Sequence, residues 1–327
     1  MLAYIIRRLL TMIPTLLIIS FITFIIIQLP PGDFFTTLQA EVAETGGGQD
    51  KEVIKRLQEV YGLDKPLIVQ YVKWLAGFIR LDFGYSLEWN APVWSVIGSK
   101  LAYTIFLGIL SMIFMVIISI PIGIYSASHQ YSLGDHALSA IGFVGLSIPG
   151  FLLALVWMFI AIIVFHIDAG GVMSEKMANA PWSVAKVADY LNHLWPAVVI
   201  LGLASTAQLQ RIMRSSLLDV LGQQYITTAR AKGLPEYKVI NKYGVRVAIN
   251  PLISVIALEV PKIINASTLV GIVMMLPTLG PVFLRSLRSQ DMYLAGTILL
   301  FSTLLLMVSN LIADIVLAWV DPRIVYT

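Results

Sequence analysis

The sequence contains no cysteine among its 327 residues. This absence excludes thiolate nucleophiles, Cys-ligated zinc, iron–sulfur clusters and a disulfide scaffold. Charged residues are also scarce, at 13% of the chain against roughly 25% in a soluble domain. Hydrophobic residues make up 58% and the mean hydropathy is +0.83, which is more apolar material than one soluble core can bury. The composition therefore predicts a protein embedded in a bilayer.

Several catalytic and binding motifs are absent as well. No Gly-x-x-x-x-Gly-Lys-Ser/Thr run occurs, so the chain has no phosphate-binding loop for ATP. The histidines lack the spacing of metal ligands, and residues 145–150 lack the Gly-x-Ser-x-Gly order of a hydrolase. A net charge of +3 is too small to indicate nucleic-acid binding. We therefore expect no catalytic site, no metal site and no cofactor bound by this chain.

Six apolar stretches read as membrane-spanning helices, which need roughly 20 residues each. They comprise residues 9–29, 101–125, 137–165, 194–209, 247–277 and 292–320. Arg7 and Arg8 precede the first stretch as in a signal peptide, but the stretch is too long and lacks a small-residue cleavage site. We therefore expect an all-α polytopic membrane protein with six spans, the first of them uncleaved.

The distribution of lysine and arginine predicts the orientation, because basic residues resist translocation. With the N-terminus in the cytoplasm, the inner segments carry Arg7, Arg8, Arg211, Arg214, Arg230, Lys232, Lys238, Lys242, Arg246 and Arg323. The short outer loops carry only Lys176, Lys186, Arg285 and Arg288. Both termini are therefore predicted to be cytoplasmic.

This topology divides the chain into a first segment with its span (residues 1–29), an extracytoplasmic insertion (30–100) and a five-helix core (101–327). Within the insertion, Asp50 is placed to cap a short amphipathic helix that Gly62 ends. Aromatic residues crowd the return to the membrane, and we interpret them as anchors at the lipid interface, with substrate contact as the alternative. They are Trp74, Phe78, Phe83, Tyr85, Trp89 and Trp94.

The most polar inner segment is the loop at residues 211–246, which is far longer than a simple connection between two helices. Its sequence predicts a helix over 217–232, a stop at Gly233, and a second helix opened by Pro235 and Glu236. Two short helices hinged at a glycine would form a compact knob that fits a cleft of another protein. Alternatively, the basic residues only satisfy the orientation rule and contact lipid head groups.

The same loop carries a family resemblance. The run Tyr-Ile-Thr-Thr-Ala-Arg-Ala-Lys-Gly-Leu at residues 225–234 resembles the coupling-loop signature of binding-protein-dependent ABC transporter permeases. It is most similar to the B-type subunit of the dipeptide and oligopeptide permeases, in which this loop docks onto the ATP-binding subunit. The resemblance implies that Ala229 and Gly233 take the motif's alanine and glycine positions, with Arg230, Lys232 and Leu234 flanking the docking site.

The resemblance extends along nearly the whole chain. Further landmarks are Pro31-Gly32-Asp33, Tyr61-Gly-Leu-Asp-Lys-Pro66, Leu81-Asp-Phe-Gly-Tyr-Ser86, Ser147-Ile-Pro149 and Asp321-Pro-Arg323. The resemblance implies the permease subunit of an ATP-driven importer for oligopeptides or dipeptides, with oligosaccharides as the alternative substrates. It places the chain in a bacterial or archaeal cell membrane, in contact with lipid and not with nucleic acid.

The resemblance also implies partners. They are a second homologous permease subunit, two ATP-binding subunits that hold ATP and Mg²⁺, and an extracytoplasmic solute-binding protein. The chain itself would then be no enzyme. A different class of function, an ion-coupled secondary transporter with Glu259 as proton carrier, would show inverted repeats with paired broken spans, which we do not find in the sequence.

Polar residues interrupt the fifth span. Glu259 and Lys262 are three residues apart, so they share one helix face and can pair. A lone charge at mid-bilayer costs about 2.5–3.5 kcal/mol, and such residues usually face a bundle interior or a wet cavity. We interpret the face that bears Glu259, Lys262 and Asn265 either as a wall of the translocation pathway or as a structural ion pair between helices.

Overall fold

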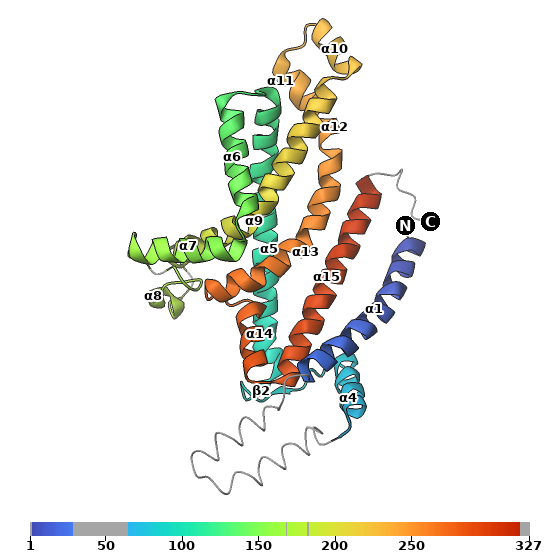
Figure 1. The fold of residues 1–327 in the computed structure, drawn as a ribbon, viewed down its shortest axis with the longest axis vertical. Helices are drawn as coiled ribbons and strands as arrows, with labels where there is room; N and C mark the ends of the chain where they lie inside the picture. The colour runs from blue at the N-terminus through green and yellow to red at the C-terminus, as the bar shows by residue number, and fades with distance from the viewer. Residues whose placement is uncertain (1, 29–64, 168, 182, 321–327) are drawn as a thin grey trace. The chain divides into compact units, whose positions relative to one another are not determined.

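The computed structural model describes residues 2–28, 65–167, 169–181 and 183–320, and most of these residues are helical (Figure 1). Five helices in this part of the chain are long and apolar enough to cross a membrane. They are α1 (Leu2–Gln28), α5 (Val93–Ser128), α9 (Val184–Leu221), α13 (Asn250–Val273) and α15 (Met292–Val320). The predicted all-α membrane fold is confirmed, while the helix expected after Asp50 lies outside the described residues.

The third predicted span is not one straight helix. The single helix expected over 137–165 is wrong, because α6 (Leu133–Ser147) and α7 (Gly150–Ile163) meet at 103°. Ile148 between them is extended, with φ −99° and ψ 124°, because the ring of Pro149 disfavours helical geometry in the preceding residue. Taken together, the two helices form the third of the six apolar stretches, with a sharp bend at its centre.

The helices around the inner loop also differ from the sequence-based expectation. The fourth span was expected to end near residue 209, but α9 continues as a helix to Leu221. The helix expected over 217–232 is wrong, because Gly222 ends α9 and the extended Gln223 precedes a separate helix, α10 (Gln224–Ala231). The chain then forms α11 (Glu236–Lys238), the π-helix η1 (Val239–Gly244) and α12 (Val245–Ala248).

Contacts within the chain group the described residues into two compact units, and the larger is formed chiefly by Tyr103–Pro277. It contains most of α5, the bent pair, a short helix α8 (Glu175–Ala178), α9, the inner loop and α13. Its core is apolar and includes the fully buried Leu107, Met115, Leu209, Met213 and Leu252. Glycine allows α5 and α9 to pack closely, since a Cβ at Gly123 would lie 2.6 Å from the Cβ of Met213.

The second unit comprises Ile6–Ala102 and Thr278–Met307 as far as they are described. It holds α1, α4 (Leu67–Ile79), an antiparallel hairpin of β1 (Tyr85–Ser86) and β2 (Ala91–Pro92), and α14 (Leu279–Arg288). The starts of α5 and α15 complete it.

The aromatic residues of this second unit are only partly where the sequence places them. The interpretation of Trp74 and Phe83 as lipid anchors is wrong, because these side chains are only 4% and 8% exposed and lie in the unit's apolar core. The Phe83 ring packs 5.2 Å from the Phe301 ring. Trp89 and Trp94 remain exposed.

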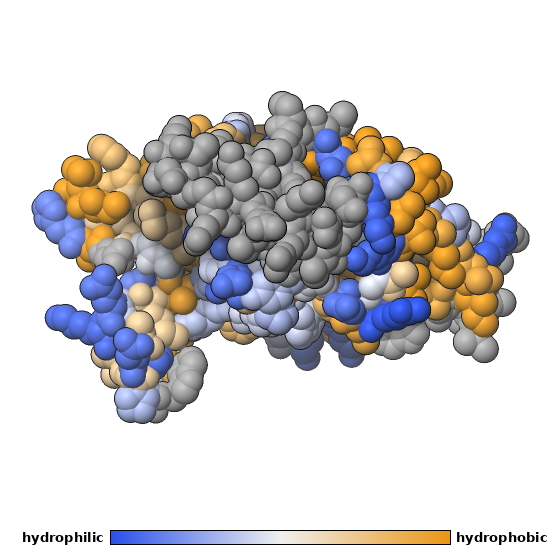
Figure 2. Space-filling view, turned by 90° about the horizontal axis from the view of Figure 1, so that it is seen from below, coloured by the Kyte–Doolittle hydropathy of each residue, from blue (hydrophilic) through white to orange (hydrophobic). Residues whose placement is uncertain are grey.

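Apolar side chains also cover much of the outer surface. Leu10, Ile18 and Ile117 are each at least 60% exposed, and broad hydrophobic areas are visible in Figure 2. Such a surface is expected where long helices meet lipid instead of water.

Candidate functional site

The inner loop forms a compact knob of residues 222–248. Its first helix, α10, ends in a left-handed turn at Gly233, with φ +73°. The Gly233 N–H donates to the Arg230 carbonyl at 2.9 Å and the Leu234 N–H donates to the Ala229 carbonyl at 3.3 Å. This pair of bonds is the Schellman arrangement that ends many helices, and it confirms the predicted stop at Gly233.

The knob has a small apolar core of its own. Ile226, Ala229 and Val239 are buried in it, and Leu234 packs against them. Burial of each large apolar side chain contributes about 1.5–3 kcal/mol. The π-helix η1 supplies Val239, so the irregular segment after α11 closes the knob from the other side.

An ion pair bridges the two arms of the knob across the glycine turn. The Arg230 guanidinium donates to the Glu236 carboxylate at 2.6 Å and 3.2 Å. These hydrogen bonds hold the pKa of Glu236 below its ordinary value and raise the pKa of Arg230. Because both side chains are about half exposed, the pair contributes little stability and mainly fixes the orientation of Arg230.

The five residues expected to couple to a partner therefore fall into two groups. Arg230, Lys232 and Gly233 lie on the exposed surface of the knob. Ala229 is 6% exposed and Leu234 is half-buried, so these two hold the knob together from inside. Apart from Gly233 itself and its two chain neighbours, no atom of the described residues lies within 4 Å of the position that a Gly233 Cβ would occupy, so this surface is open to a neighbouring protein.

The polar face of α13 is built around a buried carboxylate. Glu259 is 2% exposed, accepts a 2.7 Å hydrogen bond from the Ser205 hydroxyl of α9, and pairs with the Lys262 ammonium at 2.6 Å. The predicted pairing of Glu259 with Lys262 is confirmed. The Lys262 side chain is itself 60% exposed, and Asn265 is exposed on the same face.

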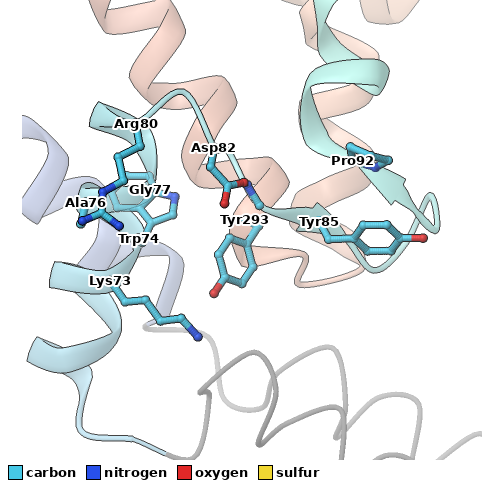
Figure 3. A pocket seen from close by; sticks show the side chains of 10 residues that line it. Lys73, Trp74, Ala76, Gly77, Arg80, Asp82, Tyr85, Pro92 and Tyr293 are labelled. Carbon is cyan, nitrogen blue, oxygen red and sulfur yellow. The ribbon is translucent and has the colours of Figure 1, made fainter.

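A second polar site lies at the hairpin. A cleft of about 560 Å³, here called the hairpin cleft, lies between α4, the following loop and the start of α15 (Figure 3). Lys73 of α4 and Arg80, which directly follows α4, line one side, and Asp82 and Tyr293 line the other side. Figure 3 shows the Lys73 ammonium and the Tyr293 hydroxyl directed toward the same side of the cleft.

Two glycines shape the hairpin cleft. A Cβ at Gly77 would lie 2.7 Å from the Asp82 carbonyl oxygen, so only glycine lets the loop return this close to α4. Gly84 has φ +79°, and a Cβ there would lie 2.5 Å from the Tyr293 ring. The two glycines therefore let the loop that carries Arg80 and Asp82 lie close to α4 and to the Tyr293 ring.

Asp291 fixes the hairpin to the start of α15. This fully buried carboxylate accepts hydrogen bonds from the Ser86 hydroxyl at 2.6 Å, the Glu88 N–H at 3.2 Å and the Leu294 N–H at 3.1 Å. Burial raises its pKa, and these hydrogen bonds oppose that effect. Arg285 adds a second tie, since it pairs with Glu88 at 2.6 Å.

Sequence reasoning missed the hairpin anchor and a further ion pair. Asp291 stands directly before the apolar stretch that starts at Met292, so its role as a helix N-cap was readable from the sequence. The bidentate ion pair between Asp135 of α6 and Arg214 of α9 joins residues far apart in the chain, so no local sequence pattern predicts it.

Comparisons with known proteins agree with this architecture. The family model "binding-protein-dependent transport system inner membrane component" matches residues 119–326, and the N-terminal model of such membrane components matches residues 1–108. The chain is 38% identical to the oligopeptide transport system permease protein AppB of Bacillus subtilis, over the full length of both.

Other relatives are similar over almost their whole length. The glutathione transport system permease protein GsiC of Salmonella typhimurium is 32% identical over 100% of both chains. The dipeptide transport system permease protein DppB of Escherichia coli is 31% identical over 99% of both. Among solved structures, the MetNI methionine ABC transporter in an inward-facing conformation matches with a TM-score of 0.54 and 20% identity, covering 70% of this chain and 98% of that one. This last likeness concerns the fold.

Proposed function

Because the chain belongs to the family of binding-protein-dependent transport system inner membrane components, we propose that it is a permease subunit that imports short peptides. Members of this family are multi-pass membrane subunits of ABC transporters, and ATP hydrolysis is carried by their ATP-binding partners. Peptides are the proposed substrate class because relatives named for oligopeptides, glutathione and dipeptides are 31–38% identical over nearly the full chain.

The proposed complex contains a second homologous permease subunit, two ATP-binding subunits with ATP and Mg²⁺, and an extracytoplasmic solute-binding protein. Both termini and the knob are proposed to lie in the cytoplasm, which the distribution of basic residues supports. The observation that carries the proposal is the knob itself, which presents Arg230, Lys232 and Gly233 on an open surface above its own apolar core. The chain has no phosphate-binding loop, so ATP hydrolysis would be carried out by a partner.

The knob offers a mechanical connection. A pathway that opens to alternate sides must shift between two conformations. A binding partner shifts that equilibrium when it binds the two conformations with unequal affinity. Closure of the ATP-binding subunits would supply this bias. The turn at Gly233, which is held by its two backbone hydrogen bonds, would transmit the bias to α9 and α13, which continue from the two ends of the knob.

The polar face of α13 is proposed to line the translocation pathway. Lys262 lies within an apolar helix of membrane-spanning length, and its side chain is largely exposed on this chain. Contact of that ammonium with lipid would be costly, so the face that bears Lys262 and Asn265 meets either water or the second permease subunit. Glu259 is held by Ser205 and Lys262, an arrangement that suits a fixed countercharge better than a mobile proton carrier.

The test is uptake into vesicles that contain the complete complex and the solute-binding protein. We expect an alanine tripeptide to accumulate when ATP is trapped on the side of the ATP-binding subunits, and to do so in the presence of an uncoupler. Uptake that needs an ion gradient and ignores ATP would contradict the proposal and favour a secondary transporter. Accumulation of a glucose trisaccharide in place of the tripeptide would leave the importer intact and replace its substrate class.

The same vesicles test the pathway assignment. Lys262→Met removes the exposed ammonium, whereas Lys242→Met removes an exposed ammonium from the knob. We expect only the α13 variant to change the ratio of uptake between tripeptides with a free and an amidated carboxyl end. An unchanged ratio would assign Lys262 to a purely structural pair.

A further inference from the structure

A groove between α6 and α9 is not used by the proposed transport mechanism. It has a volume of about 260 Å³ and lies entirely within the larger unit. Its polar end is lined by His136, Arg211 and Arg214, and its apolar end by Phe143, Leu146 and Ala207. The groove thus changes from basic to hydrophobic along its length.

The charge of the polar end comes from Arg211. The described residues that line the groove include one carboxylate, that of Asp135, and it is already paired with Arg214 at 2.8 Å and 3.0 Å. Asp135 is 2% exposed and also accepts a 3.0 Å hydrogen bond from the Tyr131 N–H. Arg214 is therefore neutralised inside the groove wall, while the exposed Arg211 guanidinium leaves the groove with a positive charge.

The apolar end opens on a surface that belongs in hydrocarbon. Phe143 and Leu146 are 56% and 40% exposed, and the adjacent Ile141 and Val144 on α6 are also exposed. The helix pair that contains them has the length and hydropathy of a membrane crossing. Gly142 lies at the floor of the groove, where a Cβ would sit 3.4 Å from the Ala207 Cβ, so α6 and α9 approach closely there.

We propose that this groove binds an anionic phospholipid, with the phosphate at Arg211 and an acyl chain along Phe143 and Leu146. Basic sites between membrane helices at the headgroup level attract anionic lipid, and the attraction falls off within a Debye length. A soluble phosphate would use only the basic end, and an acidic protein loop would leave the exposed apolar end uncovered. The proposal needs only that these helices are in a membrane, so it does not depend on the substrate.

The experiment measures the lipid that stays with the purified transporter complex. The complex is incorporated into phosphatidylcholine nanodiscs with spin-labelled phosphatidylglycerol, and the immobilised fraction of the label is recorded. Arg211→Gln removes the groove charge, and Arg288→Gln is the matched control because it makes the same change at an exposed arginine outside both the groove and the knob. We expect roughly fivefold weaker retention of phosphatidylglycerol in the first variant and wild-type retention in the second.

A second variant tests the apolar end. Leu146→Trp places a larger side chain along the groove, so it should displace labelled phosphatidylcholine as well as phosphatidylglycerol. Equal retention in Arg211→Gln and wild type would overturn the proposal. Competition by soluble glycerol phosphate as effective as by lipid would also overturn it, as would loss of an ATP-binding subunit from Arg211→Gln with lipid retention unchanged.

Discussion

Gly233→Asp is expected to uncouple ATP hydrolysis from transport without disturbing insertion. Gly233 has φ +73°, and beyond its chain neighbours no described residue comes within 4 Å of its Cβ position, so the internal cost is that of a left-handed non-glycine residue, about 1–2 kcal/mol. Such a cost changes the population of the formed turn by a factor of about 5–30. The apolar core of the knob and its Schellman bonds are sufficient to keep the turn formed.

The effect on the partner contact should be much larger. A new carboxylate at the centre of the docking surface would be buried without a partner against the ATP-binding subunit, and burial of an unpaired charge is strongly unfavourable. Purified complexes of the variant should therefore insert normally, and ATP hydrolysis should continue in the presence of the solute-binding protein. Peptide uptake per ATP hydrolysed, measured in vesicles, should fall at least tenfold.

Gly171→Asp is the matched control for this measurement. Gly171 has φ +74° and equally open space around its Cβ position, but it lies in the segment between α7 and α8 and not in the knob. It adds the same charge and the same backbone cost at a different place. Equal loss of uptake in both variants, or normal uptake in Gly233→Asp, would refute the reasoning.

Three further predictions concern residues outside the knob. Arg214→Met should lower the free energy of unfolding by about 3 kcal/mol, because it leaves the buried Asp135 carboxylate without its ion pair. Thermal unfolding should show that adding Asp135→Asn restores part of the lost stability, and a double variant as unstable as Arg214→Met would contradict the pairing. Asp291 has a raised pKa, so the folded state binds its proton more tightly, and stability should fall as the pH rises from the ordinary aspartate range near 3.9 to the raised value. Melting curves of Asp291→Asn should lack that slope, and identical slopes would rule the assignment out. We further propose that the basic residues Lys73 and Arg80 make the hairpin cleft a docking surface for the solute-binding protein. Their reversal to glutamate should then raise the concentration of that protein needed for half-maximal ATPase stimulation about tenfold, and an unchanged value would exclude the cleft as its docking surface.

The sequence predicts the long helices well because their signal is local. A run of apolar residues marks α1, α5 and α15 without reference to any other part of the chain. Gly233 was predictable for a similar reason, since a glycine followed two residues later by a proline, at the end of a polar helix, is typical of a left-handed stop. The Glu259–Lys262 pair follows from helix periodicity alone.

Features that depend on distant contacts could not be read in the same way. The burial of Trp74 depends on Gly296, more than two hundred residues later, where a Cβ would lie 2.9 Å from the indole. Aromatic residues near a span look alike in sequence whether they meet lipid or a protein core. The pair of Asp135 with Arg214 likewise depends on how α6 packs on α9.

The bend between α6 and α7 also determines how many times the chain crosses the membrane, and therefore on which side each later loop lies. Helices of 15 and 14 residues extend only about 21–23 Å each, so neither arm alone traverses a hydrocarbon layer of about 30 Å. If the two arms together make one crossing, four crossings precede the knob, and the knob lies on the same side of the membrane as the N-terminus. If either arm lay flat along the surface, every later loop would change sides and the basic residues of the knob would face outward. The membrane orientation of every later segment is thus decided at Ile148 and Pro149.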